Sequence, residues 1–117
     1  MPGECLYRKN YCFTDSEFEK LQILFSEVQN DITSSKIFPY KTKLKLLEKL
    51  EEIILQIERS MENLDSLWSF IGRIEIAFKV YGRNKIPDAL KDLVKVTWQV
   101  QCRAEGREPD SLPPIIL

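Results

Sequence analysis

The chain has 117 residues, with 17 basic and 18 acidic side chains, a formal net charge of −1 and no histidine. A chain of this length fits one domain with its own hydrophobic core. The near balance of charge excludes a whole-protein field that would draw it to nucleic acid or to an anionic membrane.

The N-terminal part of the sequence predicts an extended arm followed by a helix. Residues 1–13 form the arm, whose start, MPGECLYRKN, lacks the apolar core of a signal peptide. Thr14 and Glu17 have the spacing of a capping box, which marks the first turn of a helix. Apolar residues then recur at helical spacing as far as Ile32. We therefore expect a helix over about residues 15–32.

A second helix is expected after a loop. The segment TSSKIFPYKT contains two serines and a proline, which interrupt helices. From Lys41 to Met61 the leucines and isoleucines fall on about a third of the helical wheel, and charged residues cover the rest. The pattern predicts a long amphipathic helix over residues 41–61. Asn63 and Asp65 are suitable N-caps, so the chain should break near residues 62–65; the alternative is one continuous helix of about 40 residues.

The third expected helix, over residues 65–81, has an unusually wide apolar arc. The arc spans roughly 180°, whereas contact with one neighbour needs roughly 100°. We therefore expect this helix to be central in the fold. Glu75 falls inside the arc and must either reach water or a basic partner at the rim, or be a buried acid with a raised pKa in a cleft.

The fourth helix is expected to start near Pro87 and to end near Gly106. The remaining residues, 107–117, read REPDSLPPIIL and should form an extended C-terminal tail because of their three prolines. Helices joined by short loops favour antiparallel neighbours. The predicted fold is thus an all-α, single-domain antiparallel bundle of about four helices over residues 1–117, with extended N- and C-terminal arms.

The cysteines bear on the cellular compartment. Cys5, Cys12 and Cys102 form an odd set without a CxxC pair, which favours free thiols in a reducing compartment. The apolar runs are also too short to span a bilayer. We therefore expect a cytoplasmic protein.

The sequence offers no catalytic residue, cofactor site or metal site. The absence of histidine excludes the commonest general base and the histidine-containing zinc sites. Neither GxxxxGK[ST] nor GxGxxG occurs, so these phosphate-binding loops are missing. The acidic side chains of the first two helices, Glu17 among them, are expected mostly on solvent faces.

Two groups of residues are candidates for binding a partner. Trp98 lies at the margin of the fourth helix's apolar stripe, next to Val94 and Lys95, and could anchor a partner or cap the core. Ile76 and Val80 lie one turn apart on the polar arc of the third helix and could contact a partner, the N-terminal arm or the PPIIL tail. The predicted partner-binding residues are Trp98, Val94, Lys95, Ile76, Val80 and Arg73.

A basic patch marks the start of the second helix. Cations there oppose the helix macrodipole, so they suggest an acidic partner surface or a phosphate backbone, although a solvated lysine face would look the same. The residues of this basic patch are Lys36, Lys41, Lys43, Lys45 and Lys49.

Together these features favour a non-catalytic protein–protein interaction module, such as a small regulator, an adaptor or an immunity/antitoxin-type inhibitor. Its partner would be another protein or a second copy of itself, and we expect no binding to a membrane. The alternatives are a nucleic-acid-binding accessory protein that uses the basic patch, and a small enzyme that works without histidine.

Overall fold

The computed structural model describes residues 11–82, 86–108 and 110–115, and over these the protein is a four-helix bundle. The helices are α1 (Asp15–Ser34), α2 (Tyr40–Gln56), α3 (Asp65–Tyr81) and α4 (Asp88–Glu105). Two short strands, β1 (Tyr11–Cys12) and β2 (Ser60–Met61), pair in antiparallel register, with Tyr11 opposite Met61 and Cys12 opposite Ser60. The prediction of an all-α single domain with four helices is confirmed.

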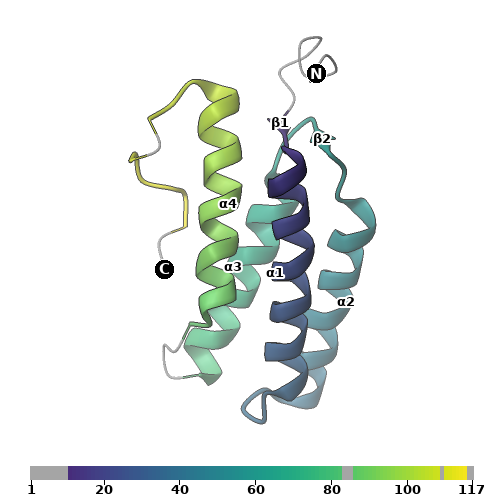
Figure 1. Cartoon of the computed structure of the whole chain (residues 1–117). Helices are drawn as coiled ribbons and strands as arrows, with labels where there is room; N and C mark the ends of the chain where they lie inside the picture. The colour runs from purple at the N-terminus through teal and green to yellow at the C-terminus, as the bar shows by residue number, and fades with distance from the viewer. Residues whose placement is uncertain (1–10, 83–85, 109, 116–117) are drawn as a thin grey trace.

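The helices run alternately down and up, so that neighbours in the sequence are neighbours in space (Figure 1). α1 packs mainly against α2 and α4, and α3 packs mainly against the same two helices. The inward stripes of the four helices form one buried core, in which Leu21, Phe70 and Leu93 are among the completely buried side chains. Among the described residues, no helix is both long enough and apolar enough to cross a membrane.

The capping box at the start of α1 is confirmed. The Thr14 hydroxyl accepts a hydrogen bond from the Glu17 N–H at 3.1 Å, and Glu17 Oε1 accepts one from the Thr14 N–H at 2.9 Å. These two bonds satisfy N–H groups that have no partner inside the helix. α1 therefore begins where the sequence predicts.

The second helix is shorter than predicted. α2 ends at Gln56, and Ile57 is already in an extended conformation. The next residues use their backbone for the β1–β2 pair, and the Phe13 N–H donates to the Arg59 carbonyl at 2.8 Å. Ile57 is buried and Met61 packs against the core even though neither is helical. Their spacing fitted a helix, so the apolar pattern could not reveal where α2 ends.

The wide apolar arc of α3 has a simple explanation. We expected a central position for this helix, and the packing gives it two main helical neighbours, as it gives α1. The additional apolar residues meet segments between and after the helices. Phe38, in the α1–α2 connection, stacks edge-on against Phe78 and Tyr81 at centroid distances of 4.9 Å and 6.0 Å. Ile115, beyond α4, lies over Gly72.

The last helix ends as predicted. Gly106 has a φ of 68°, the left-handed conformation that glycine adopts most easily. The Arg107 N–H then donates to the Cys102 carbonyl at 2.8 Å, which closes the helix end. Beyond this point the described residues contain no helix or strand, and the chain runs back beside α4 (Figure 1).

The cysteine prediction is wrong at one position. Cys12 is disulfide-bonded, whereas Cys102 is a free, buried thiol. The expectations for residues 1–10, including the thiol of Cys5, lie outside the described residues. Because disulfides persist mainly in oxidising compartments, the thiol argument for a reducing compartment does not hold at Cys12.

Candidate interaction surfaces

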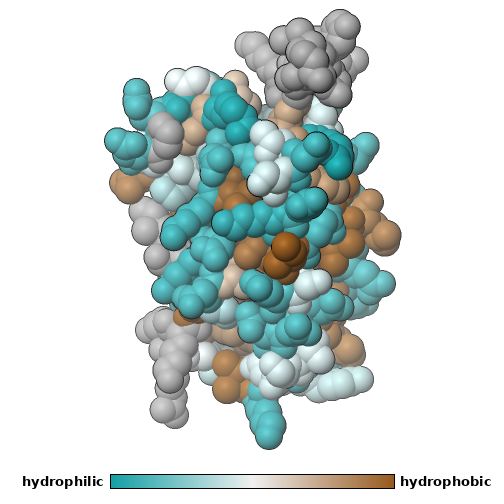
Figure 2. Space-filling view, in the orientation of Figure 1, coloured by the Kyte–Doolittle hydropathy of each residue, from teal (hydrophilic) through white to brown (hydrophobic). Residues whose placement is uncertain are grey.

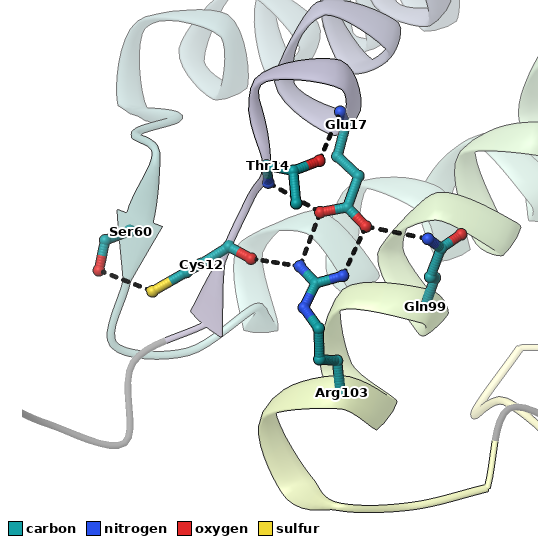
Figure 3. A network of polar contacts seen from close by, with 6 residues as sticks. All are labelled: Cys12, Thr14, Glu17, Ser60, Gln99 and Arg103. Carbon is teal, nitrogen blue, oxygen red and sulfur yellow. Dashed lines mark hydrogen bonds and ion pairs between the residues drawn. The ribbon is translucent and has the colours of Figure 1, made fainter. Parts of the chain in front are cut away.

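The carboxylate of Glu17 is the centre of a network of polar contacts among the described residues (Figure 3). Arg103 of α4 binds it through two nitrogens, Nη1 to Oε2 at 2.8 Å and Nη2 to Oε1 at 2.7 Å. Gln99 donates to Oε2 at 3.1 Å, and Arg103 Nη2 also donates to the Cys12 carbonyl at 2.7 Å. One carboxylate thus joins the start of α1 to α4, and its arginine partner extends the connection to β1.

This carboxylate is buried, which corrects the expectation that it faces solvent. Glu17 is 7% exposed. Burial by itself raises the pKa of the Glu17 carboxyl, but the bonds from Arg103 and from the Thr14 backbone outweigh it, and the net pKa is lowered. All its strong acceptor directions are used by donors of the same chain. The cluster therefore holds α1, α4 and β1 together.

The predicted patch on α3 is exposed. Ile76 is 63% and Val80 is 65% exposed, one turn apart, and the Arg73 side chain is also exposed. Neither the described part of the N-terminal arm nor the C-terminal segment covers the two aliphatic side chains. Glu75 has the rim position that was one of the two alternatives, because its carboxylate pairs with Lys79 Nζ at 2.7 Å.

The other predicted group is covered by the chain itself. Trp98 is 8% exposed, and Val94 is buried as well, while Lys95 remains exposed. The Trp98 Nε1–H donates to the Ser111 carbonyl at 2.8 Å, so the C-terminal segment lies across this indole. The structure therefore does not bring Trp98 and the Ile76/Val80 patch together on one open surface.

Two of the five residues in the basic patch have intramolecular partners. Lys43 Nζ donates to the Ser35 carbonyl at 2.6 Å and to the Thr33 carbonyl at 3.2 Å. Lys49 pairs with Glu52 at 3.5 Å. Lys36, Lys41 and Lys45 are exposed. The contacts of Lys43 explain why a cation occurs near the start of α2. Its ammonium group donates to carbonyls at the end of α1, where the helix macrodipole favours positive charge.

Exposed apolar residues also occur on α2, outside the two predicted partner-binding groups. Leu44 and Leu55 are exposed on this helix, and Leu47 and Ile54 are only partly buried. Figure 2 shows hydrophobic surface at the edge of the molecule where α2 lies, beside a largely hydrophilic face formed by α1 and α4. Periodicity alone does not separate core positions from solvent-facing positions at the margin of an apolar stripe.

The described residues form an open hollow that a small ligand could reach. A shallow hollow of about 420 Å³ lies between α1 and the start of α4; its lining residues are Glu27, Asn30, Asp31, Pro87, Asp88 and Ala89. Within residues 11–82, 86–108 and 110–115, no three potential ligands among histidine, cysteine, aspartate and glutamate are grouped to hold a metal ion.

Comparisons of the chain with protein-family models, with curated proteins and with solved structures find no match. The functional argument therefore rests on the residues and their geometry.

Proposed function

We propose that this protein is a non-catalytic protein-binding module that contacts its partner through the exposed arc of α3. The observation that carries the proposal is the pair Ile76 and Val80, two aliphatic side chains that stay largely exposed on a helix whose other apolar residues are mostly buried. Scattered single aliphatic residues are common on protein surfaces, whereas adjacent ones become useful when a partner covers them. Arg73 adjoins them, and arginine is enriched at protein interfaces.

The partner would be another protein or a second copy of this chain. A regulator, an adaptor or an immunity/antitoxin-type inhibitor would have this size and helical class, which is an argument by analogy. The nucleic-acid alternative has less support, because Lys43 and Lys49 of the basic patch are engaged within the chain. A nucleic-acid interface needs basic side chains that are free to reach phosphates.

The test compares two aspartate substitutions at similarly exposed aliphatic residues. Val80→Asp places a charge in the patch on α3, and Ile23→Asp does so on α1, where the side chain is 58% exposed. We expect Val80→Asp to weaken capture of a partner from the source cell by about tenfold or more, and Ile23→Asp to leave it unchanged. Circular dichroism should show both variants as helical as the wild type.

Two further measurements identify the kind of partner. Nuclease treatment should leave a protein partner bound, whereas phosphate-mediated binding would fall steeply with salt. Light scattering reports a second copy, since a two-fold dimer through the patch would lose half its mass in Val80→Asp. If Val80→Asp and Ile23→Asp keep every partner and the same mass, the patch on α3 is ordinary surface and the proposal fails.

A further inference from the structure

The α3–α4 groove, the surface that Gly72 of α3 forms with Trp98 and Cys102 of α4, is covered by the chain's own residues 108 and 110–115. Three contacts seat this C-terminal segment. The Trp98 Nε1–H donates to the Ser111 carbonyl at 2.8 Å, and the Cys102 thiol lies 3.6 Å from the Glu108 carbonyl oxygen. Further along, a Cβ added to Gly72 would lie 3.6 Å from Cδ1 of Ile115, so this side chain packs where α3 has none.

The floor of the groove is aromatic. Trp68 of α3 and Trp98 of α4 meet at a centroid distance of 6.3 Å and an interplanar angle of 66°. The Trp68 Nε1–H is satisfied inside the floor, because it donates to Gln101 Oε1 at 2.7 Å. The Trp98 N–H instead donates out of the floor to the segment. The groove therefore combines the apolar surface of two indole rings with one hydrogen-bond donor, the Trp98 Nε1–H, that points toward the bound segment.

The contacts that hold the segment could be made by many peptides, because they need few particular side chains. The two polar contacts from α4 use backbone carbonyls, and the apolar contact uses one aliphatic side chain, Ile115. Leu112 and Pro114 remain exposed, and Pro113 is half-buried between the two seated residues. Proline suits such a position since it has no N–H to leave unsatisfied over apolar rings, and its fixed φ limits the entropy lost on binding. Aromatic grooves that bind proline-containing segments recur in protein recognition for these reasons.

We propose that the α3–α4 groove is a binding site for proline-containing segments of partner proteins, and that residues 108 and 110–115 occupy it in their absence. The partner segment would place a backbone carbonyl at Trp98 and, about four residues later, an aliphatic side chain over Gly72. This inference goes beyond the proposed function, because it concerns a surface other than the Ile76/Val80 patch and does not depend on it.

The chain's own segment competes with any partner at a high effective concentration, since it is tethered beside the groove. A free peptide should thus bind the wild type weakly. It should bind more tightly to a full-length variant in which the contacts between the C-terminal segment and the groove are weakened. Ile115→Ser removes the aliphatic contact over Gly72 and leaves the groove intact. Leu112→Ser is the matched control, because Leu112 belongs to the same segment but is 75% exposed.

The probe is a synthetic peptide with the sequence REPDSLPPIIL, added to the full-length proteins. The protein contains two tryptophans, and both lie in the floor of the groove, so fluorescence excited selectively at tryptophan, and not at the four tyrosines, reports on this site. We expect Ile115→Ser to bind the peptide about tenfold more tightly than the wild type or Leu112→Ser. A second peptide with both adjacent prolines replaced by alanine should bind more weakly.

Trp98→Phe, added to Ile115→Ser, keeps an aromatic ring and removes the donor. It should weaken peptide binding about threefold to tenfold, the loss expected for one hydrogen bond. The milder Ile115→Ala serves the same purpose as Ile115→Ser if circular dichroism shows that the serine variant has lost helix.

Several results would overturn the proposal. The peptide could fail to bind any variant, bind wild type, Ile115→Ser and Leu112→Ser equally, or bind with unchanged affinity after Trp98→Phe. A wild-type mass that doubles with concentration, and returns to one chain in Ile115→Ser, would show that the second occupant is another copy of this chain and not a separate partner.

Discussion

At the scale of single residues, the polar side chains with the most partners hold distant parts of the chain together. Glu17 and Arg103 are 86 positions apart and form a bidentate pair on which α1, α4 and β1 converge. The capping box revealed Glu17 as the third residue of α1, but its arginine partner left no signal in the local sequence. A bidentate charged pair is stronger and geometrically more specific than a single ionic contact.

Lys43 gives a prediction at this scale. α1 has no basic residue in its last turn, and Lys43 of α2 supplies the cation that its terminal carbonyls lack. Lys43→Met keeps the aliphatic stem and should lower the free energy of unfolding by about 1 kcal/mol. Lys41→Met, at an exposed position on the same helix, should change it by less than about 0.5 kcal/mol.

Urea denaturation of both variants measures the difference. Equal stabilities for Lys43→Met and Lys41→Met would mean that the contacts of Lys43 with α1 contribute nothing.

At the scale of the helices, two residues of the same type can differ in burial and therefore in their contribution to stability. Ile74 of α3 is completely buried, whereas Ile23 of α1 is largely exposed. Ile74→Ala should lower the free energy of unfolding by about 2 to 5 kcal/mol, because it removes packed methyl groups and leaves a cavity. Ile23→Ala should cost less than about 1 kcal/mol.

Thermal and urea unfolding provide the comparison for these two alanine variants. Similar losses in Ile74→Ala and Ile23→Ala would contradict the packing of α3 between α2 and α4. The same helix explains its own composition: its apolar arc is wide because Phe38 and Ile115 cover surface that the neighbouring helices leave open.

At the scale of the whole molecule, stability should depend on pH in the acid range. The pKa values of Glu17 and Glu105 are lowered in the fold, Glu17 by Arg103 and the Thr14 backbone against the effect of burial, and Glu105 chiefly by the bond from the Tyr11 hydroxyl. A carboxyl with a lowered pKa stabilises the fold at pH values above its ordinary pKa, which is 4.5 for both groups, and loses that contribution as the pH falls. Asp31 acts in the opposite sense, because burial and then Glu27 raise its pKa.

Glu17→Gln tests this account. At pH 7 it should lower the free energy of unfolding by roughly 2 to 4 kcal/mol, less than for a fully buried pair because the Arg103 side chain is 46% exposed. Below pH 4.5 the variant should lose less further stability than the wild type does. Glu19→Gln, an exposed position on α1, is the control and should follow the wild-type curve.

Urea titrations at pH 7, 5, 4 and 3 would give the two curves. A Glu17→Gln variant with the wild-type stability and the wild-type acid dependence would show that the Glu17–Arg103 pair is energetically neutral, as some ion pairs are.

The sequence by itself determined the four helices, the capping box at Thr14 and the helix end at Gly106, because each depends on residues within one or two turns. It also predicted that Ile76 and Val80 lie outside the apolar stripe of α3, since helical spacing settles that geometry.

Only the tertiary structure decided what each surface meets. It placed Arg103 on Glu17, Lys43 on the carbonyls of α1, and Ser111 of the C-terminal segment over Trp98. It also ended α2 at Gln56, because the backbone that follows pairs with β1. The same physical reason applies to these three contacts and to the end of α2. An apolar stripe shows which side of a helix is removed from water. The segment that covers this side comes from a distant part of the chain and is selected by packing and hydrogen bonding in three dimensions.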